Sequence, residues 1–323
     1  SHIKRQLQYE TWKKPVCSGK YSLSAEEISR DIFVKIAEKI KKEQRVEEIE
    51  AVLTYPVTFS EHLKKKLKGC AEQAGIKVIE MLTEPFAAMF SDEIIEKFEE
   101  SKKEYNCIIF DFGGSTLDIC LIRASGKEKK KIELLASSGM VFGGYDISEL
   151  IFNDIILENF KKEIDEADKN HTYSRHASIS ELRPQAEELK VNLNQSDCED
   201  DDTEEIAFLG KRVSISKKDI NDMLDKHEIN KKIKDLIINM IDSVDEGMET
   251  DDISEVIMVG GTSHMTYFQD IIKEIFEDED IIDEDILEDD AVFYNSVSCG
   301  AARYISEKEN YDISKTIPLA VGF

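Results

Sequence analysis

The sequence lacks the patterns that mark membrane proteins and small disulfide-rich domains. No apolar run approaches the roughly 20 residues that a membrane-spanning helix needs, and the first residues show no signal-peptide pattern. The six cysteines form no CxxC pair. We therefore expect reduced thiols in a cytoplasmic protein, with no disulfide framework, zinc site or membrane partner.

Basic residues are also scarce. Lys and Arg total 42 against 68 Asp and Glu, which gives a formal net charge of −26. A field of that sign repels phosphate backbones, so no nucleic-acid partner is expected. Seven acidic residues lie within 197–205 and ten within 277–290. These two stretches are interpreted either as solvated loops or as a docking surface for a basic partner. A nucleotide is not excluded, because nearby amides and a metal ion outweigh a distant field.

What the chain does contain is a substantial core. Of its 323 residues 41% are hydrophobic, enough for one large two-lobed domain or two ordinary ones. A helix opens at Ser24, which forms a capping box with Glu27. The isoleucines at every fourth position from Ile28 to Ile40 predict the buried stripe of this helix.

Strands and helices are expected along the rest of the chain. The strands are expected at 49–55, 77–82, 106–111, 116–123, 131–139 and 255–259, with a hairpin between 206 and 215. The helices are expected at 60–75, 93–105, 146–169, 178–194, within 216–247 and from about 266. Three strands between 106 and 139 follow one another directly, unlike the strand–helix alternation of a dinucleotide-binding fold.

The segment Asp111–Asp118 (Asp-Phe-Gly-Gly-Ser-Thr-Leu-Asp) is the most informative one chemically. An apolar strand leads into Gly113 and Gly114, whose N–H groups a phosphate approaches without a Cβ in the way. Thr116 can donate to a phosphate oxygen, and the terminal aspartates are spaced to hold hydrated Mg²⁺ or orient water. The alternative is an ordinary glycine hairpin whose aspartates accept turn N–H groups.

Two further glycine pairs follow apolar strands and precede helices. They are Gly143-Gly144, within Phe142–Asp146, and Gly260-Gly261, within Val256–His264. Each places flexible amides near a helix N-terminus, where anions bind readily. Three such turns in one chain favour phosphate binding far more than one does.

The order of these turns resembles the nucleotide-binding domain of the seventy-kilodalton heat-shock (DnaK-type) chaperones, in the actin-like ATPase superfamily. That family's D-L-G-G-G-T-F-D turn is matched by Asp111–Asp118, with Ser115 replacing the third glycine. Its N-E-P-T-A-A motif is matched by Thr83–Ala88, and its V-G-G-S-T-R motif by Val259–His264. Ile3–Leu7 resembles the stretch that carries a catalytic lysine.

The resemblance implies an α/β fold, the two-lobed actin-like ATPase (ribonuclease H-like) domain. Residues 1–105 would be the remainder of lobe I and 106–300 lobe II, with a helical and hairpin subdomain inserted at about 147–227. Gly300-Ala301-Ala302 resembles the family's second connecting helix, within a closing helix and linker at 301–315. Residues 316–323 would start a substrate-binding β-domain. The family's first phosphate hairpin, D-x-G-T-T, has no counterpart here, and we expect it upstream.

The resemblance also assigns roles to single residues. Lys4 would contact the transferred phosphate, and Thr116 the γ-phosphate. Glu84 and Asp111 would hold Mg²⁺ through water, while Asp118 would help orient the attacking water. The remaining nucleotide contacts would be Gly113, Gly114, Ser115, Gly143, Gly144, Glu187, Lys190, Gly260, Gly261, Thr262 and His264.

Some of these residues also have a simpler structural interpretation. Glu84 is also suited to a helix start, and Lys4 to a solvated surface. Glu187 and Lys190 are spaced as a surface ion pair, and His264 suits a hydrogen-bonded loop.

Other positions depart from the family pattern. Val191 and His264 replace two arginines that stack on adenine, which would forfeit about 0.5–2 kcal/mol. Tyr145 replaces an acidic residue. These departures indicate a divergent family member.

The function implied is an ATP-binding, slowly ATP-hydrolysing domain of a cytoplasmic heat-shock chaperone, with ATP/ADP and Mg²⁺ as ligands. Client polypeptides would bind a following domain, and co-chaperones or nucleotide exchange factors are further expected partners. One alternative is a regulatory co-chaperone relative with little or no hydrolysis. A lower-ranked one is an actin-like filament protein.

Overall fold

The structure is a computed structural model that describes residues 3–17, 19–100, 104–125, 131–194, 198–244, 247–288 and 290–315. The strands are β1 (Lys13–Val16), β2 (Tyr21–Ser24), β3 (Ile49–Tyr55), β4 (Ile76–Thr83), β5 (Tyr105–Phe112), β6 (Leu117–Ser125), β7 (Lys131–Met140), β8 (Thr203–Phe208), β9 (Lys211–Ser216), β10 (Glu255–Val259) and β11 (Asp312–Lys315). The largest sheet has the order β10-β5-β6-β7-β11, and β1-β2, β3-β4 and β8-β9 form pairs.

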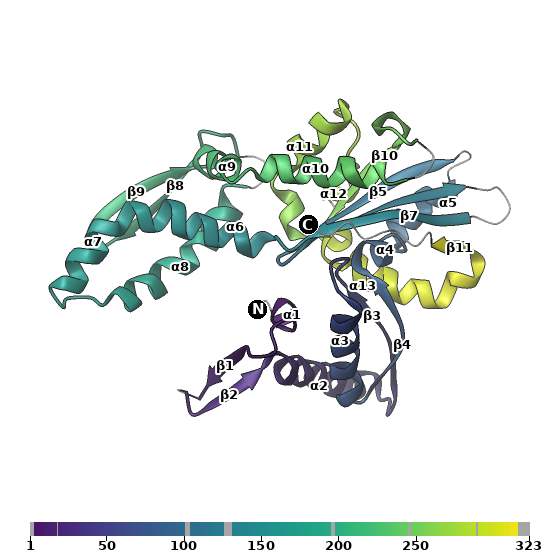
Figure 1. Cartoon of the computed structure of the whole chain (residues 1–323), viewed down its shortest axis with the longest axis horizontal. Coiled ribbons are helices and arrows are strands. Elements are labelled where there is room, and N and C mark those ends of the chain that lie inside the picture. The colour runs from purple at the N-terminus through teal and green to yellow at the C-terminus, as the bar shows by residue number, and fades with distance from the viewer. Residues whose placement is uncertain are drawn as a thin grey trace. The chain divides into compact units, whose positions relative to one another are not determined.

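Helices occupy most of the remaining chain (Figure 1). They are α1 (Ile3–Gln6), α2 (Ala25–Gln44), α3 (Glu61–Gln73), α4 (Glu84–Ala88), α5 (Asp92–Glu100), α6 (Gly144–Leu150), α7 (Leu157–Lys169), α8 (Arg175–Asn192), α9 (Lys217–Lys226), α10 (Ile229–Asp242), α11 (Thr266–Phe276), α12 (Glu284–Glu288) and α13 (Asp290–Glu307). Single turns of 3₁₀-helix lie at η2 (Thr250–Asp252), η3 (Gly261–His264) and η4 (Lys308–Asn310), and η1 (Ile151–Ile156) is π-helical.

The chain divides into two compact units that are discontinuous in sequence. The first unit comprises residues 1–105, 118–139 and 295–323, and the second comprises 106–117 and 140–294. The expected lobes differ in assigning 118–139 and 295–300 to lobe II, and those lobe boundaries stay a prediction. Part of the expected linker forms strand β11, which runs parallel to β7. Residues 316–323 lie outside the described residues.

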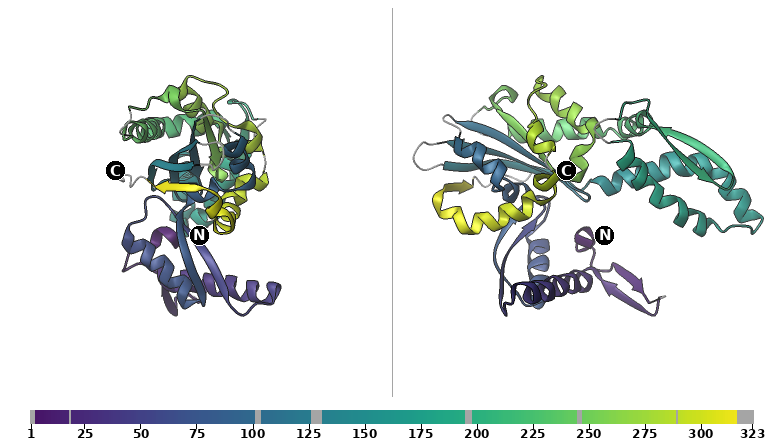
Figure 2. Two further views of the ribbon diagram at one scale, coloured as in Figure 1. Left: turned by 90° about the vertical axis from the view of Figure 1, so that its right-hand side faces the viewer. Right: turned by 180° about the vertical axis from the view of Figure 1, so that it is seen from behind.

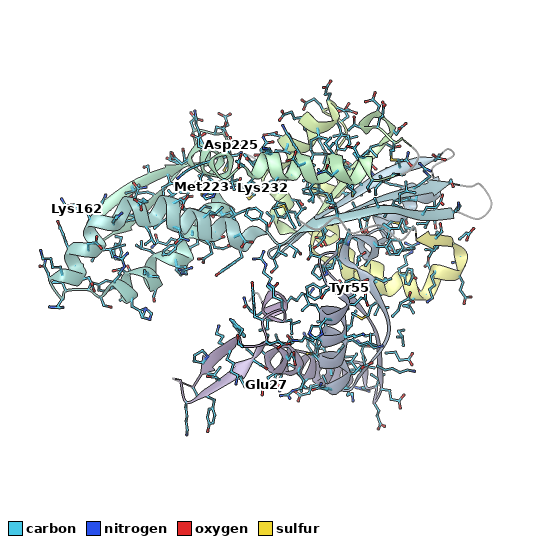
Figure 3. The ribbon with its side chains drawn as sticks, in the orientation of Figure 1. Glu27, Tyr55, Lys162, Met223, Asp225 and Lys232 are labelled. Atoms are coloured by element: carbon cyan, nitrogen blue, oxygen red, sulfur yellow. The ribbon has the colours of Figure 1, made fainter. Side chains whose placement is uncertain are left out.

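In the first unit, α2 begins as the sequence predicted. The Ser24 N–H donates to Glu27 Oε2 at 2.8 Å, and the Glu27 N–H donates to Ser24 Oγ at 3.2 Å. Glu27 lies in the first turn of α2 (Figure 3). These reciprocal bonds satisfy backbone donors that a helix start leaves without partners, and they confirm the predicted capping box.

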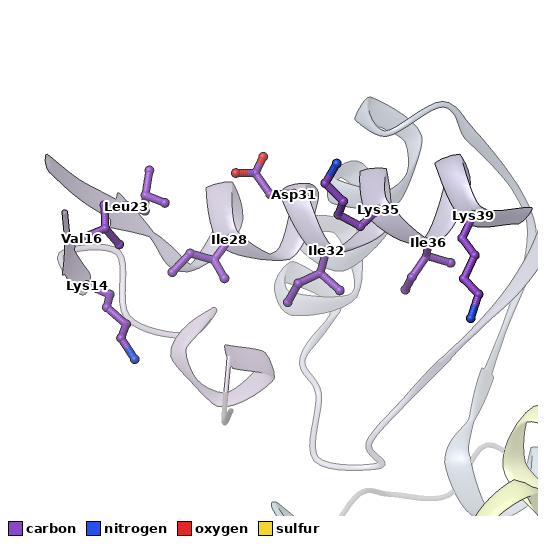
Figure 4. A pocket seen from close by; sticks show the side chains of 9 residues that line it. All are labelled: Lys14, Val16, Leu23, Ile28, Asp31, Ile32, Lys35, Ile36 and Lys39. Carbon is purple, nitrogen blue, oxygen red and sulfur yellow. The ribbon is translucent and has the colours of Figure 1, made fainter. Parts of the chain in front are cut away.

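The predicted buried stripe of α2 is wrong in its middle. Ile32 and Ile36, which point to the same side of α2 in Figure 4, are 40% and 44% exposed, whereas Ala25, Ser29 and Ala37 are buried. Small side chains let α2 pack closely on α3, in a core cluster that also contains residues of β3 and β4. The helix therefore has two apolar stripes, and packing selected the one with the small residues.

Helices α4 and α13 approach each other closely within the first unit. A Cβ at Gly300 would lie 2.0 Å from the Ala87 carbonyl oxygen. Beside this contact the Tyr304 ring packs edge-on against Phe90, with centroids 5.0 Å apart, and its hydroxyl donates to Glu80 Oε1 at 2.9 Å. Gly300 thus allows a backbone contact that any side chain would push apart.

In the second unit, α6, η1 and α7 form one continuous helical segment over 144–169, as expected except for its π-helical middle. The hairpin β8-β9 turns through Leu209 and Gly210, both at positive φ, between the paired residues Phe208 and Lys211. Two such residues form the tight turn that suits the twist of a hairpin. The hairpin packs along α7 and α8, as Figure 2 shows from behind.

The acidic stretch 277–290 also belongs to this unit and is not simply a solvated loop. Ile281, Ile282 and Ile286 are buried, and α12 forms within the stretch. Its acidic residues are therefore carried on a folded segment that apolar side chains anchor.

We predict that Gly300→Ala destabilises the protein by about 1–3 kcal/mol, because the new methyl group would collide with the Ala87 carbonyl. Denaturant unfolding would measure the loss. The matched control is Gly69→Ala in α3, where no atom lies within 4 Å of the added Cβ. There we expect a gain of about 0.5–1 kcal/mol. Equal effects at both positions would contradict the close contact.

Candidate functional site

The three glycine turns meet within the second unit, around the segment that follows β5. Strands β5 and β10 run parallel with Val259 opposite Asp111, so both strands end at the same edge. Gly260 follows at φ +86°, and a Cβ there would lie 2.7 Å from Asp111 Oδ1 and 2.8 Å from the Phe112 carbonyl carbon. Positive φ and close approach both require glycine here.

The third turn, at Gly143 and Gly144, packs on the first. The Gly144 N–H donates to the Gly113 carbonyl at 3.1 Å, and the Tyr145 N–H to the Gly114 carbonyl at 3.0 Å. The Thr262 hydroxyl also donates to the Gly113 carbonyl, at 2.9 Å. All three turns therefore converge on Gly113 and Gly114.

No Cβ fits between these turns. A Cβ at Gly143 would lie 2.6 Å from the Gly114 carbonyl carbon and the Ser115 nitrogen, and one at Gly144 would lie 2.7 Å from Thr262 Oγ1. Gly114 and Gly261 are exposed, whereas Asp111 and Thr116 are buried. The result is an exposed backbone edge with a carboxylate and a hydroxyl beside it, which suits a phosphate group and its cation.

Glu187 and Lys190, two of the expected nucleotide contacts, belong to a hydrogen-bonded cluster. Lys190 is buried, and its Nζ donates to the Gly144 carbonyl at 2.9 Å, to Ser148 Oγ at 3.0 Å and to Glu187 Oε2 at 2.8 Å. Ser148 Oγ in turn lies 2.5 Å from Glu187 Oε2. The cluster links α8 to the start of α6. Glu187 and Lys190 therefore form more than a surface ion pair. Sequence reasoning missed Ser148.

The two expected adenine-side positions carry no guanidinium. Val191 is 52% exposed on α8, and His264 ends η3, where its carbonyl accepts a hydrogen bond from Gln269 Nε2 at 3.3 Å. An exposed valine offers an apolar contact to a base but no cation–π attraction.

Tyr145, which had no explanation from sequence, connects α6 to α8. Its hydroxyl donates to Glu149, Glu149 pairs with Arg183, and the Arg183 guanidinium lies 4.4 Å from the centre of the Phe152 ring. Burial raises the pKa of the Tyr145 hydroxyl above its ordinary value, and the Glu149 carboxylate raises that pKa further.

In the first unit, Glu84 begins α4 and forms an ion pair with Lys4. Asp118 is buried, and its Oδ1 accepts the Val57 N–H at 2.6 Å. Lys4 is thus neither distant from Glu84 nor simply solvated, although 80 residues separate the two in sequence. Val57, which orients Asp118, carries no signal in the sequence.

The chemistry of the donor set suits a cation held through water. Among the residues that the structure describes, no group of three or more His, Cys, Asp or Glu side chains is arranged to hold a metal ion. Mg²⁺ keeps several waters and needs only one or two carboxylates beside substrate phosphates. Asp111, whose carboxylate lies beside Gly260, is one carboxylate of this kind.

We predict that Gly143→Ala costs about 1–3 kcal/mol of stability, because the methyl group would overlap the backbone of Gly114 and Ser115. Gly114→Ala is the matched control, since no atom lies within 4 Å of its Cβ. It should be neutral or stabilise by up to about 1 kcal/mol. Chemical denaturation of the two variants measures these changes in the free energy of unfolding. Comparable losses in both would show that the turns do not meet as described.

A pH titration tests the Tyr145 contact. Because the folded pKa of Tyr145 is raised, its hydrogen bond is fully present below the unfolded pKa of about 10 and is lost as pH rises through the folded pKa. The tyrosinate absorbance of wild type minus Tyr145→Phe should show one group that ionises later than free tyrosine. Glu149→Gln should bring that ionisation back toward the ordinary value. Ionisation at or below the free value would contradict the contact.

A comparison with protein families finds a match, described as Hsp70 protein, over residues 1–322. Members of that family generally bind ATP or ADP with Mg²⁺, so the match supports a chaperone-type nucleotide-binding domain. Within the described part of the chain, no helix is long and apolar enough to cross a bilayer. From the convergent glycine turns and a match over nearly its whole length, the chain belongs to the Hsp70 family and has the actin-like ATPase fold.

Proposed function

We propose that this chain binds ATP and ADP with Mg²⁺ and hydrolyses ATP slowly, coupling its nucleotide state to a substrate-binding domain. The observation that carries the proposal is the convergence of three glycine turns on Gly113 and Gly114, packed so closely that no Cβ fits at Gly143, Gly144 or Gly260. A phosphate-binding backbone needs such close approach. Hsp70 proteins are generally ATPases, which favours this use of the turns over an unrelated anion site.

Within the second unit, the backbone of Gly113, Gly114 and Ser115 would contact the phosphates, and the Thr116 hydroxyl would donate to the γ-phosphate. Asp111, buried beside Gly260, would hold the cation through water. Gly260, Gly261 and Thr262 would line the adenosine side, with Val191 and His264 beside the base. Catalysis would then rest on positioning and charge neutralisation.

The ammonium group of Lys190 would bind protein acceptors instead of the ribose. Its three contacts to Gly144, Ser148 and Glu187 match the three donors of an ammonium group. Lys190 would therefore hold the Gly144 turn in place, while Glu187, whose side chain is more exposed, would meet the ribose hydroxyls.

In the first unit, Lys4 and Glu84 would act as a pair. Glu84 would hold the cation through its water shell, and the Lys4 ammonium would compensate phosphate charge. Asp118, oriented by the Val57 N–H, would accept a hydrogen bond from the attacking water. Mg²⁺, when bound, supplies charge neutralisation at the phosphates.

A regulatory relative with little hydrolysis is the second candidate. The loss of both guanidinium groups at Val191 and His264 favours it, because weaker base stacking lowers affinity and loosens nucleotide positioning. The same turns would then sense nucleotide without turnover. An actin-like filament protein ranks below both.

The expected result is that Mg²⁺–ATP stabilises the purified chain against heat by about 2.7 kcal/mol at 100 times its Kd, with slow release of phosphate. Glu84→Gln and Asp111→Asn should each lower release by roughly 10²-fold, whereas Glu47→Gln, at an exposed position outside the site, should change neither readout. Differential scanning fluorimetry and a phosphate assay measure the two effects.

The alternatives separate in the same experiment. Stabilisation without phosphate release would favour the regulatory relative, and nucleotide-dependent light scattering from polymers would favour a filament protein. A chain that neither Mg²⁺–ATP nor Mg²⁺–ADP stabilises would overturn the proposal.

A further inference from the structure

Ser148 contributes a buried hydroxyl to the second unit, and the proposed function gives this hydroxyl no role. The residue lies in α6 and is 8% exposed. Its Oγ is 3.0 Å from the Gly144 carbonyl oxygen, 3.0 Å from Lys190 Nζ and 2.5 Å from Glu187 Oε2. A serine hydroxyl has a single hydrogen and can also accept from other donors. The two oxygen atoms near Ser148 therefore compete for that hydrogen.

The separations direct the Ser148 hydrogen to Glu187. A distance of 2.5 Å is that of a charge-assisted O–H···O⁻ bond, at about 2.5–2.7 Å, whereas 3.0 Å is the upper limit for a hydroxyl donor. The Gly144 carbonyl already accepts the Lys190 ammonium at 2.9 Å. Lys190 also donates to Glu187 Oε2, at 2.8 Å. Glu187 Oε2 thus accepts two hydrogen bonds, one from Lys190 and one from Ser148.

These two bonds restrict a side chain that is otherwise exposed. The Glu187 side chain keeps 57% of its surface in contact with solvent. An exposed glutamate on a helix samples several rotamers, and a ligand that binds it must overcome the loss of that freedom. Because Lys190 and Ser148 already hold one carboxylate oxygen, less freedom remains to be lost on binding.

The cluster also connects Glu187 to the glycine turns. The Gly144 N–H donates to the Gly113 carbonyl at 3.1 Å, and the Gly144 carbonyl accepts Lys190. A hydrogen-bonded path therefore runs from the Gly113 turn through Gly144 and Lys190 to Glu187. The carboxylate is held relative to the turn that would contact the phosphates.

A carboxylate in this position favours an uncharged, hydrogen-bond-donating part of a ligand. It has acceptors only and repels phosphates, which the backbone N–H groups of the turns would bind. Two neighbouring hydroxyl groups are the matching chemistry, because each can donate to a carboxylate oxygen. In a nucleotide these are the 2′ and 3′ hydroxyls of the ribose.

We propose, resting on the nucleotide binding proposed above, that Ser148 is a positioning residue that fixes the Glu187 carboxylate for the ribose hydroxyls. The site would then prefer nucleotides that carry these hydroxyls over nucleotides that lack them. Ser148 itself would not touch the ligand. Its hydroxyl would act by holding Glu187 in the orientation that the sugar needs, so that the hydrogen bonds to the sugar form at a smaller entropic cost.

The probes are ATP and 2′,3′-dideoxy-ATP, each with Mg²⁺, titrated into the full chain by isothermal titration calorimetry. The wild-type chain should bind ATP at least about tenfold more tightly, as expected for hydrogen bonds to a charged group. Ser148→Ala should weaken ATP by about three- to tenfold and leave the dideoxy nucleotide nearly unaffected. A residue that merely held α6 against α8 would weaken both nucleotides by the same factor.

Two further variants locate the effect. Glu187→Ala removes the carboxylate and should abolish the preference for ATP over the dideoxy nucleotide. Ser178→Ala is the matched control, because Ser178 is a buried serine of α8 whose hydroxyl donates to the Ser174 carbonyl at 3.2 Å, outside the cluster. This variant should keep the wild-type preference.

Failure of this inference is distinguishable from failure of the proposed function. Equal wild-type affinities for the two nucleotides would overturn the inference alone. So would an affinity ratio that Ser148→Ala leaves unchanged, whether both affinities fall or neither does, and so would an equal loss of preference in Ser178→Ala. A chain that binds neither nucleotide would overturn the proposed function and the inference together.

Discussion

Backbone packed directly on backbone is the constraint on which the second unit depends. Gly143 lies against the peptide between Gly114 and Ser115, and Gly260 lies against Asp111 and Phe112, at separations that leave no volume for a Cβ. The hydrogen bonds to the Gly113 and Gly114 carbonyls hold the turns in this arrangement. Chain segments that are far apart in sequence therefore form one polar edge, at which Gly114 and Gly261 are exposed.

Side chains beside the turns make this arrangement rigid. Lys190 satisfies the Gly144 carbonyl and the Ser148 hydroxyl from α8, and Tyr145 connects the same helix start to Arg183 through Glu149. Two independent connections thus join α6 to α8. Buried networks are strong when all their members are satisfied, so the buried Lys190 contacts hold the Gly144 turn against α8.

The first unit also contains a close backbone contact that only glycine permits. Gly300 lets α13 approach α4 at Ala87, and α4 begins at Glu84, the partner of Lys4. A displacement of α4 would move the carboxylate with it.

Local sequence determined much of this protein. The capping box at Ser24, the glycine turn at Gly210 and the strand–turn–strand order around Asp111 follow from short-range preferences, and the ordered glycine motifs identified the family before any coordinates did. Only tertiary structure decided which stripe of α2 is buried, that Lys4 meets Glu84, and that Ser148 and Val57 contact Lys190 and Asp118. Periodicity locates apolar stripes but not their partners, and contacts between residues 40 or more positions apart depend on packing that no local pattern records.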